Sequence, residues 1–237
     1  MKKTQLYLFF IRLHITPFRI KINGLSIYFP IFSEAIELVK EIFERKIYDI
    51  ELINPKYIVD VGSNIGISVL YFASRYPKAS IICFEPDDTA YTFLEKNIAK
   101  NKLQKTICYK FGMAQTERNA ILYSNNNGET TATLIKPAKN IGQKSEIVLK
   151  KLSSYITLEV DLLKIDTEGS EFEILQDLID NNKLELVKNI IVEFHDLPLN
   201  GEKIHEMLNI ISRAGFSISK YHDNEIKTNI MVLCKKR

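Results

Sequence analysis

The sequence predicts an α/β fold in which helices cover both faces of a doubly wound, mostly parallel sheet. From Lys56 onward, short apolar runs rich in β-branched residues alternate with longer segments of helical periodicity. Near-continuous apolar strands joined by helices are typical of parallel sheets that are buried on both faces. In such a sheet the ligand lies beyond the carboxyl ends of the strands, where the strand order reverses.

The alternation of these two patterns gives seven predicted strands and four predicted helices. The strands are Tyr57–Val61, Ser80–Phe84, Thr106–Phe111, Val160–Ile165, Asn189–Phe194, Phe216–Tyr221 and Asn229–Cys234. The helices are Ile67–Tyr76, Asp87–Asn101, Glu171–Asn181 and Glu202–Ala214. We assign residues 51–237 to one domain.

Residues 1–50 are predicted to form an N-terminal appendage. Asn23-Gly24 separates two short strand-like stretches within Arg19–Phe29. Asn-Gly is the strongest short signal for a hairpin, because both residues tolerate positive φ. Ser33–Tyr48 then carries apolar residues at helical spacing, which predicts an amphipathic helix with Ser33 available as its cap.

The apolar stretch Gln5–Ile15 near the start of the chain does not predict a membrane span. It is shorter than the ~20 residues that cross a bilayer, and Arg12 and His14 interrupt it. No small-residue cleavage site follows, so the expectation is a cytoplasmic protein. We expect the stretch to pack on the domain or on a second subunit of a homo-oligomer; contact with a membrane surface is the competing interpretation.

Composition excludes several classes of protein. The 32 Lys and Arg exceed the 29 Asp and Glu by only three, and the Lys residues are scattered, so no nucleic-acid partner is predicted. Cys83, Cys108 and Cys234 lie far apart without CxxC spacing. We therefore predict no disulfide framework, no zinc site and no other bound metal.

One stretch breaks the alternation of strands and helices. Ser124–Glu146 contains three consecutive Asn residues, Gly128 and few large apolar residues. It is predicted to be a long surface loop, either a substrate lid or a solvated insertion.

The first predicted strand runs directly into a glycine turn, Asp60-Val61-Gly62-Ser63-Asn64-Ile65-Gly66, and then into a helix. Gly62 and Gly66 let the backbone turn tightly and approach a ligand closely. A dinucleotide fingerprint, GxGxxG, would need glycine where Asn64 and Ile67 stand. A seat for a pyrophosphate is therefore not predicted.

The second strand ends in Glu85-Pro86, 25 residues after Asp60. An acidic residue at this strand end can accept hydrogen bonds from both ribose hydroxyls of a nucleoside. The glycine turn lacks the pattern of a pyrophosphate site, whereas an acidic residue that could bind ribose is present at Glu85. This combination fits a nucleoside with an amino-acid tail, which is S-adenosylmethionine. We expect its carboxylate near the N–H groups of the glycine turn and its adenine near Gly112 and Met113.

Ionisable residues gather at the ends of the fourth and fifth strands. Asp166, Glu168 and Glu171 follow one strand, and His195 ends the other. Such clustering is costly unless the groups are paired or used. Helix capping is the alternative role for Asp166 and Glu171, and Lys164, inside a buried strand, is expected to form an ion pair.

Four motifs together resemble the FkbM-type methyltransferases, a family of class I S-adenosylmethionine-dependent enzymes. They are YIVDVGSNIG at 57–66, CFEP at 83–86, LLKIDTEGSEFEIL at 162–175 and VEFH at 192–195. The resemblance covers about residues 35–237. It implies a seven-stranded sheet of order 3-2-1-4-5-7-6 with the last strand antiparallel, and O-methylation of a hydroxyl on a sugar, glycan or secondary metabolite.

The resemblance places cofactor contacts on Asp60, Gly62, Asn64, Gly66, Glu85 and Asp166. Their neighbours Ser63 and Pro86, together with Met113, complete the predicted cofactor-binding set.

For the chemistry, His195 is the first candidate for the base that activates a small-molecule or glycan acceptor, because imidazole titrates near neutrality, and Glu168 is the second. Two other functions compete with methyl transfer: a nicotinamide-dependent oxidoreductase on a similar sheet, and a non-catalytic nucleoside-binding module.

Overall fold

The computed structural model describes residues 18–30, 32–124, 132–134, 143–195, 197–223 and 229–237. The helices are α2 (Phe32–Val39), η1 (Lys40–Glu44, a π-helix), α3 (Ile67–Arg75), α4 (Asp88–Lys100), η2 (Leu152–Ser154), α5 (Glu171–Asp180), η3 (Leu184–Leu186) and α6 (Leu197–Arg213). The strands are β1 (Phe18–Ile22), β2 (Leu25–Phe29), β3 (Tyr57–Val61), β4 (Ser80–Phe84), β5 (Thr106–Tyr109), β6 (Gly112–Met113), β7 (Arg118–Ser124), β8 (Ala132–Thr133), β9 (Gln143–Lys150), β10 (Leu162–Ile165), β11 (Asn189–Phe194), β12 (Phe216–Asp223) and β13 (Ile230–Lys236).

The central sheet has seven strands in the order β12-β13-β11-β10-β3-β4-β5. Five adjacent strands of this sheet, β11, β10, β3, β4 and β5, run parallel to one another. Strand β13 is antiparallel to both of its neighbours, β11 and β12. Numbered along the chain, this is the predicted order 3-2-1-4-5-7-6 with an antiparallel last strand. The order reverses between β3 and β10, and this switch point is where a ligand is expected.

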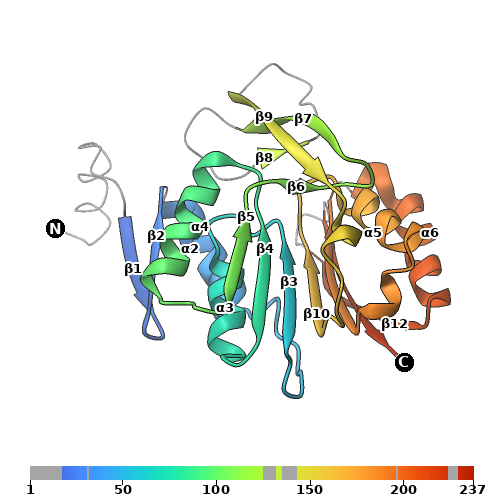
Figure 1. Ribbon diagram of the computed structural model, residues 1–237, viewed down its shortest axis with the longest axis horizontal. Helices are drawn as coiled ribbons and strands as arrows, with labels where there is room; N and C mark the ends of the chain where they lie inside the picture. Colours follow the sequence, from blue (N-terminus) through green and yellow to red (C-terminus); the bar gives the residue numbers. More distant parts are fainter. Residues whose placement is uncertain (1–17, 31, 125–131, 135–142, 196, 224–228) are drawn as a thin grey trace.

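Helices cover both faces of the sheet, with α2, α3 and α4 on one side and α5 and α6 on the other (Figure 1). Successive residues of β3 alternate between these two layers. Ile58 packs in the core that faces α3 and α4, whereas Val59 packs in the core that faces α5 and α6. The strands are therefore buried on both faces, which explains why they read as continuous apolar runs.

The predicted hairpin is present, as β1 and β2 pair antiparallel around Asn23 and Gly24, which have φ of 48° and 82°. Asn97 of α4 joins it to the main domain. Its side-chain oxygen accepts from the Tyr28 N–H at 2.7 Å, and its amide group donates to the carbonyls of Tyr28 and Ile65 at 2.9 and 2.8 Å. One buried side chain thus connects the hairpin to the glycine turn.

The predicted helix Ser33–Tyr48 is shorter than expected and changes its winding. The α-helix ends at Val39, and a π-helical turn follows to Glu44. Single π-turns are often found near functional sites. After this turn, Tyr48 lies at the cavity beside the carboxyl ends of the central strands, as described below. The side chain of Ser33, its predicted cap, is outside the described residues.

The prediction that Ser124–Glu146 is one long loop is wrong. β8 lies within it and β9 begins inside it, and together with β6 and β7 they form a second sheet of order β6-β9-β7-β8. The strands were missed because one face is solvated: Leu122 and Leu149 are buried, whereas Ile121 and Val148 are 38% and 47% exposed. The rest of the predicted loop, 125–131 and 135–142, is outside the described residues.

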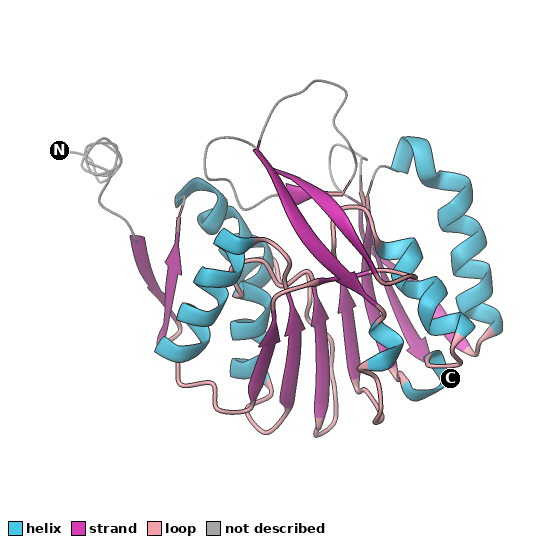
Figure 2. Cartoon of the chain, turned by 45° about the horizontal axis from the view of Figure 1, so that its top comes forward, coloured by secondary structure: helices cyan, strands magenta, loops and turns pink. Residues whose placement is uncertain are grey.

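The second sheet lies across the carboxyl ends of the central strands (Figure 2). The third predicted strand, Thr106–Phe111, is accordingly shorter than expected: β5 ends at Tyr109, and β6, which begins just after the predicted strand, belongs to the second sheet. In the part of the chain that the structure describes, no helix has the length and apolarity to cross a membrane. Gln5–Ile15 is outside that part.

We expect Asn97→Ala to lower the free energy of unfolding by about 2–4 kcal/mol, because three backbone groups lose their hydrogen-bond partner in a buried place. Lys100→Ala, which changes an exposed position of the same helix, serves as the matched control and should shift it by less than about 0.5 kcal/mol. Urea unfolding followed by circular dichroism measures both. Equal effects would show that Asn97 does not anchor the hairpin.

Candidate active site

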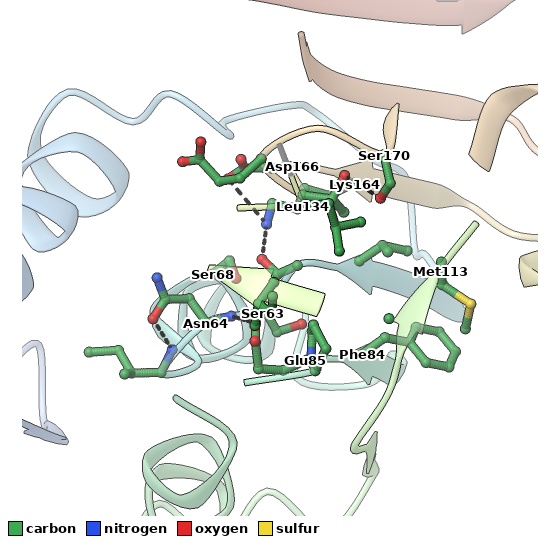
Figure 3. A pocket seen from close by; sticks show the side chains of 18 of the residues that line it. Ser63, Asn64, Ser68, Phe84, Glu85, Met113, Leu134, Lys164, Asp166 and Ser170 are labelled. Carbon is green, nitrogen blue, oxygen red and sulfur yellow. Dashed lines mark hydrogen bonds and ion pairs between the residues drawn. The ribbon is translucent and has the colours of Figure 1, made fainter. Parts of the chain in front are cut away.

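A cavity opens where β3, β4 and β10 end, beneath the second sheet (Figure 3). Eight of the predicted site residues line it: Gly62, Ser63, Asn64, Glu85, Pro86, Met113, Asp166 and Glu168. The other three, Asp60, Gly66 and His195, lie behind this lining. The sequence motifs, which are far apart along the chain, thus meet at one cavity.

Part of the lining was not predicted. Leu38, Ile42 and Tyr48 come from the N-terminal segment, and Leu122, Leu134, Ile147 and Leu149 come from the second sheet. No motif marks these residues, because each is an ordinary apolar or aromatic side chain. The short apolar runs Ala120–Tyr123 and Ile147–Leu149 were the one signal in the sequence that could have indicated these strands.

Gly62 occupies a place where no side chain fits. Its φ is +77°, and a Cβ atom there would lie 1.7 Å from the carbonyl oxygen of Asp166. The turn after β3 therefore packs directly against the backbone after β10. Gly66 also has positive φ, at +87°, and starts α3 against Leu94.

The N–H groups of the glycine turn already have acceptors within the protein. Those of Gly62 and Ser63 donate to the Phe84 carbonyl, at 3.0 and 3.1 Å, and that of Asn64 donates to Glu85 at 2.7 Å. The next two N–H groups along the turn donate to the Asn64 side chain and the Ser63 carbonyl. The expectation that a ligand carboxylate binds these groups is therefore not supported by the arrangement seen.

Glu85 lies at the cavity wall with both carboxylate oxygens in use. One oxygen accepts from the Asn64 N–H and the other from the Asp87 N–H, at 2.7 and 2.8 Å. Burial raises the pKa of Glu85 to about 7, against the lowering effect of these two hydrogen bonds. Because each carboxylate oxygen has two lone pairs, Glu85 can still accept from ribose hydroxyls.

The wall next to Glu85 is apolar and aromatic. Phe84 stacks on Tyr109 with ring centroids 5.5 Å apart, and Pro86 and Met113 line the cavity beside it. Gly112 comes close enough to Pro86 and Leu149 that a Cβ atom would touch both. Gly112 and Met113, near which the adenine is predicted to lie, are both part of this apolar wall.

Lys164 forms the predicted ion pair, and it does so in the lining of the cavity. Its fully buried ammonium group donates to the Gly62 carbonyl at 2.6 Å and lies 3.2 Å from Asp60 and 3.4 Å from Asp166. Burial disfavours the charge, but the two carboxylates raise the pKa of Lys164 above its ordinary value. Ser68 donates to the other oxygen of Asp60 at 2.6 Å, which holds that carboxylate from the opposite side.

His195 lies among carboxylates. Its Nδ1 is 2.9 Å from Glu171, while its Nε2 is 3.5 Å from Glu168 and 3.7 Å from Asp166. Burial lowers the pKa of His195, but the hydrogen bond with Glu171 and the nearby charges outweigh it and raise the pKa to about 10. The imidazole is therefore protonated at neutral pH and does not act as a ready proton acceptor.

The same residues form the one group among the described residues with metal-ligand geometry. Ligand atoms of Asp166, Glu168 and His195 lie within 4.8 Å of one another. The imidazole of His195 and the carboxylates of Asp166 and Glu168 form close ion pairs beside the cavity.

Comparison with known proteins now decides the family. A sequence model described as "Methyltransferase FkbM domain" matches residues 60–218. The chain belongs to the FkbM methyltransferase family. It is a methyltransferase that uses S-adenosylmethionine, and Glu85, Met113 and Asp166 of the predicted cofactor-binding set line the cavity at the switch point.

Relatives of this FkbM enzyme support the assignment. Methyltransferase sdnD of Sordaria araneosa is 32% identical over 212 residues, covering 75% of this chain and 82% of the relative. The 31-O-demethyl-FK506 methyltransferase FkbM of Streptomyces tacrolimicus is 23% identical over 235 residues, covering 85% of this chain and 89% of the relative.

Solved structures show the same fold. The methyltransferase FkbM of Methylobacillus flagellatus KT matches with a TM-score of 0.55 and 14% identity, over 78% of this chain and 44% of that one. The M. jannaschii TYW2 structure in complex with AdoMet matches with a TM-score of 0.53 and 14% identity, over 93% of this chain and 85% of that one.

We expect Gly62→Ala to lower the free energy of unfolding by about 3 kcal/mol or more, because the new Cβ atom meets backbone and the residue keeps positive φ. Gly201→Ala is the matched control: it adds a Cβ atom within α6, where nothing lies within 4 Å. That variant should be neutral or more stable by about 0.5–1 kcal/mol. Chemical denaturation measures both, and an unaffected Gly62 variant would contradict the packing described.

We expect the affinity for S-adenosylmethionine to fall as pH drops below about 7, the pKa of Glu85. Ribose hydroxyls donate to the ionised carboxylate, so the cofactor favours the deprotonated form, and affinity should change by up to about tenfold per pH unit. Titration calorimetry on both sides of pH 7 measures this.

Glu85→Gln should flatten the profile of affinity against pH. Glu193→Gln is the control and should not flatten it, although burial also raises the pKa of Glu193 to about 7. A profile unchanged by Glu85→Gln would remove Glu85 from the ribose site.

Proposed function

We propose that this methyltransferase transfers the methyl group to a hydroxyl oxygen of a sugar, glycan or other hydroxylated metabolite. The observation that carries the proposal is the carboxylate cluster at the ends of β10 and β11, in which Asp166 and Glu168 reach the cavity lining. A hydroxyl is a poor nucleophile at neutral pH and benefits from a nearby proton acceptor, which this cluster supplies. One relative is named as a 31-O-demethyl-FK506 methyltransferase, and this name supports an oxygen acceptor.

S-adenosylmethionine supplies an electrophilic methyl group whose leaving group is a neutral thioether. The protein has to hold the acceptor oxygen about 3 Å from that carbon and in line with the breaking bond. The cavity walls provide this confinement: the apolar second sheet covers it, and the Lys164 ion pairs fix its floor.

We propose Glu168 as the proton acceptor, in place of His195, which the sequence analysis put first. The side chain of Glu168 is 42% exposed and lines the cavity, whereas that of His195 is only 8% exposed and lies behind it. Burial raises the pKa of Glu168 above its ordinary value, which makes it a better base. His195, held by Glu171, then acts as a positioning residue that faces Glu168 with a positive charge.

The two competing functions make different predictions. A nicotinamide-dependent oxidoreductase is not favoured, since the chain belongs to a methyltransferase family and lacks the GxGxxG turn. A non-catalytic binding module would bind S-adenosylmethionine but transfer nothing. Incubation with methyl-labelled cofactor and a panel of saccharides, glycans, hydroxylated small molecules and amines separates these outcomes. Labelling of amines alone would contradict an oxygen acceptor.

With an acceptor from that panel, we expect Glu168→Gln to lower kcat by about 10²-fold or more, with little change in the dissociation constant of the cofactor. The pH profile of the wild-type enzyme identifies the base. If Glu168 accepts the proton, kcat should reach its plateau well below pH 10. If His195 did so, kcat would keep rising through its pKa of about 10. Wild-type turnover in Glu168→Gln would exclude Glu168.

A further inference from the structure

Tyr48 is a buried phenol that reaches the cofactor cavity from outside the region matched by the family model. It follows the π-helical turn of the N-terminal segment, lines the cavity and is 4% exposed. Its hydroxyl donates to Asp166 Oδ2 at 2.9 Å, across 118 residues of sequence. The matched region begins only at residue 60, so neither this residue nor its contact is part of that comparison.

The hydrogen bond decides which way the Asp166 carboxylate faces. Tyr48 and Lys164 both approach Oδ2, whereas Oδ1 faces His195 at 3.7 Å. Burial and the neighbouring carboxylates raise the pKa of Tyr48 well above its ordinary value, so the phenol remains a donor. Without the Tyr48 hydroxyl, Lys164 alone would hold this oxygen, at the longer distance of 3.4 Å.

Tyr48 is itself held in place by its neighbours. Its ring packs on Phe72 with centroids 6.1 Å apart, and the Lys164 ammonium lies 5.5 Å from its ring centre. The next residue, Asp49, pairs with Arg75 at 3.0 Å and accepts from the Tyr71 hydroxyl at 3.1 Å. The segment that carries Tyr48 is thus fastened to α3, the helix that begins at the glycine turn.

We propose that Tyr48 is a positioning residue for S-adenosylmethionine, which holds the Asp166 carboxylate in the orientation that receives the positively charged end of the cofactor. The N-terminal segment is then an integral part of the cofactor site, contributing Leu38 and Ile42 to the cavity wall as well. This inference concerns cofactor binding alone and does not depend on which acceptor the enzyme methylates.

The test is titration calorimetry of S-adenosylmethionine without any acceptor. Tyr48→Phe keeps the buried ring and removes the hydroxyl, and it should weaken binding about three- to tenfold. Tyr91→Phe is the matched control, because it removes a tyrosine hydroxyl that is bonded to the Cys108 carbonyl, away from the N-terminal segment and outside the cavity lining. Its binding should stay within about twofold of wild type.

A double-mutant cycle separates positioning from a general loss of stability. Asp166→Asn should weaken cofactor binding, and adding Tyr48→Phe to it should weaken binding no further, because the phenol acts through that carboxylate. Additive losses, wild-type affinity in Tyr48→Phe, or an equal loss in Tyr91→Phe would each overturn the proposal. Thermal unfolding of every variant confirms that folded proteins are compared. Since binding needs no acceptor, failure of the proposed O-methylation would leave these outcomes unchanged.

Discussion

The site depends on one buried charge, the Lys164 ammonium group. It ties together the glycine turn after β3, through the Gly62 carbonyl, and the carboxylates of Asp60 and Asp166. A charge in this place is costly unless it is paired and hydrogen-bonded, and both conditions are met here. The lysine therefore holds together the ends of two adjacent strands at the switch point of the sheet. These strand ends form the floor of the cavity.

The topology places the charged residues at the floor of the cavity and the apolar residues on the opposite side. The parallel strands β3, β10 and β11 bring their carboxyl ends to one edge, so their polar residues meet there as Asp60, Asp166 and His195. The second sheet covers the same edge with Leu122, Ile147 and Leu149. The cavity therefore combines a charged floor with an apolar roof.

The positions of His195 and Glu168 show why the choice of base needed the structure. In the sequence both residues end neighbouring strands, and an imidazole is the usual choice near neutral pH. In the folded protein His195 is surrounded by Glu171, Glu168 and Asp166, which stabilise its protonated form, and Glu168 occupies the accessible position. Accessibility and charge environment are properties of the assembled cluster and of neither residue alone.

The sequence by itself determined the sheet, its strands and the motif residues at their ends, because apolar periodicity and glycine turns act over a few neighbouring residues. It also determined the hairpin at Asn23-Gly24. Only the tertiary structure decided that the polar stretch after β7 forms a sheet over the cavity, that Tyr48 reaches Asp166, and that the amides of the glycine turn are occupied. These features depend on contacts between residues far apart in the chain, and only the second sheet left a local signal, the short apolar runs of β7 and β9.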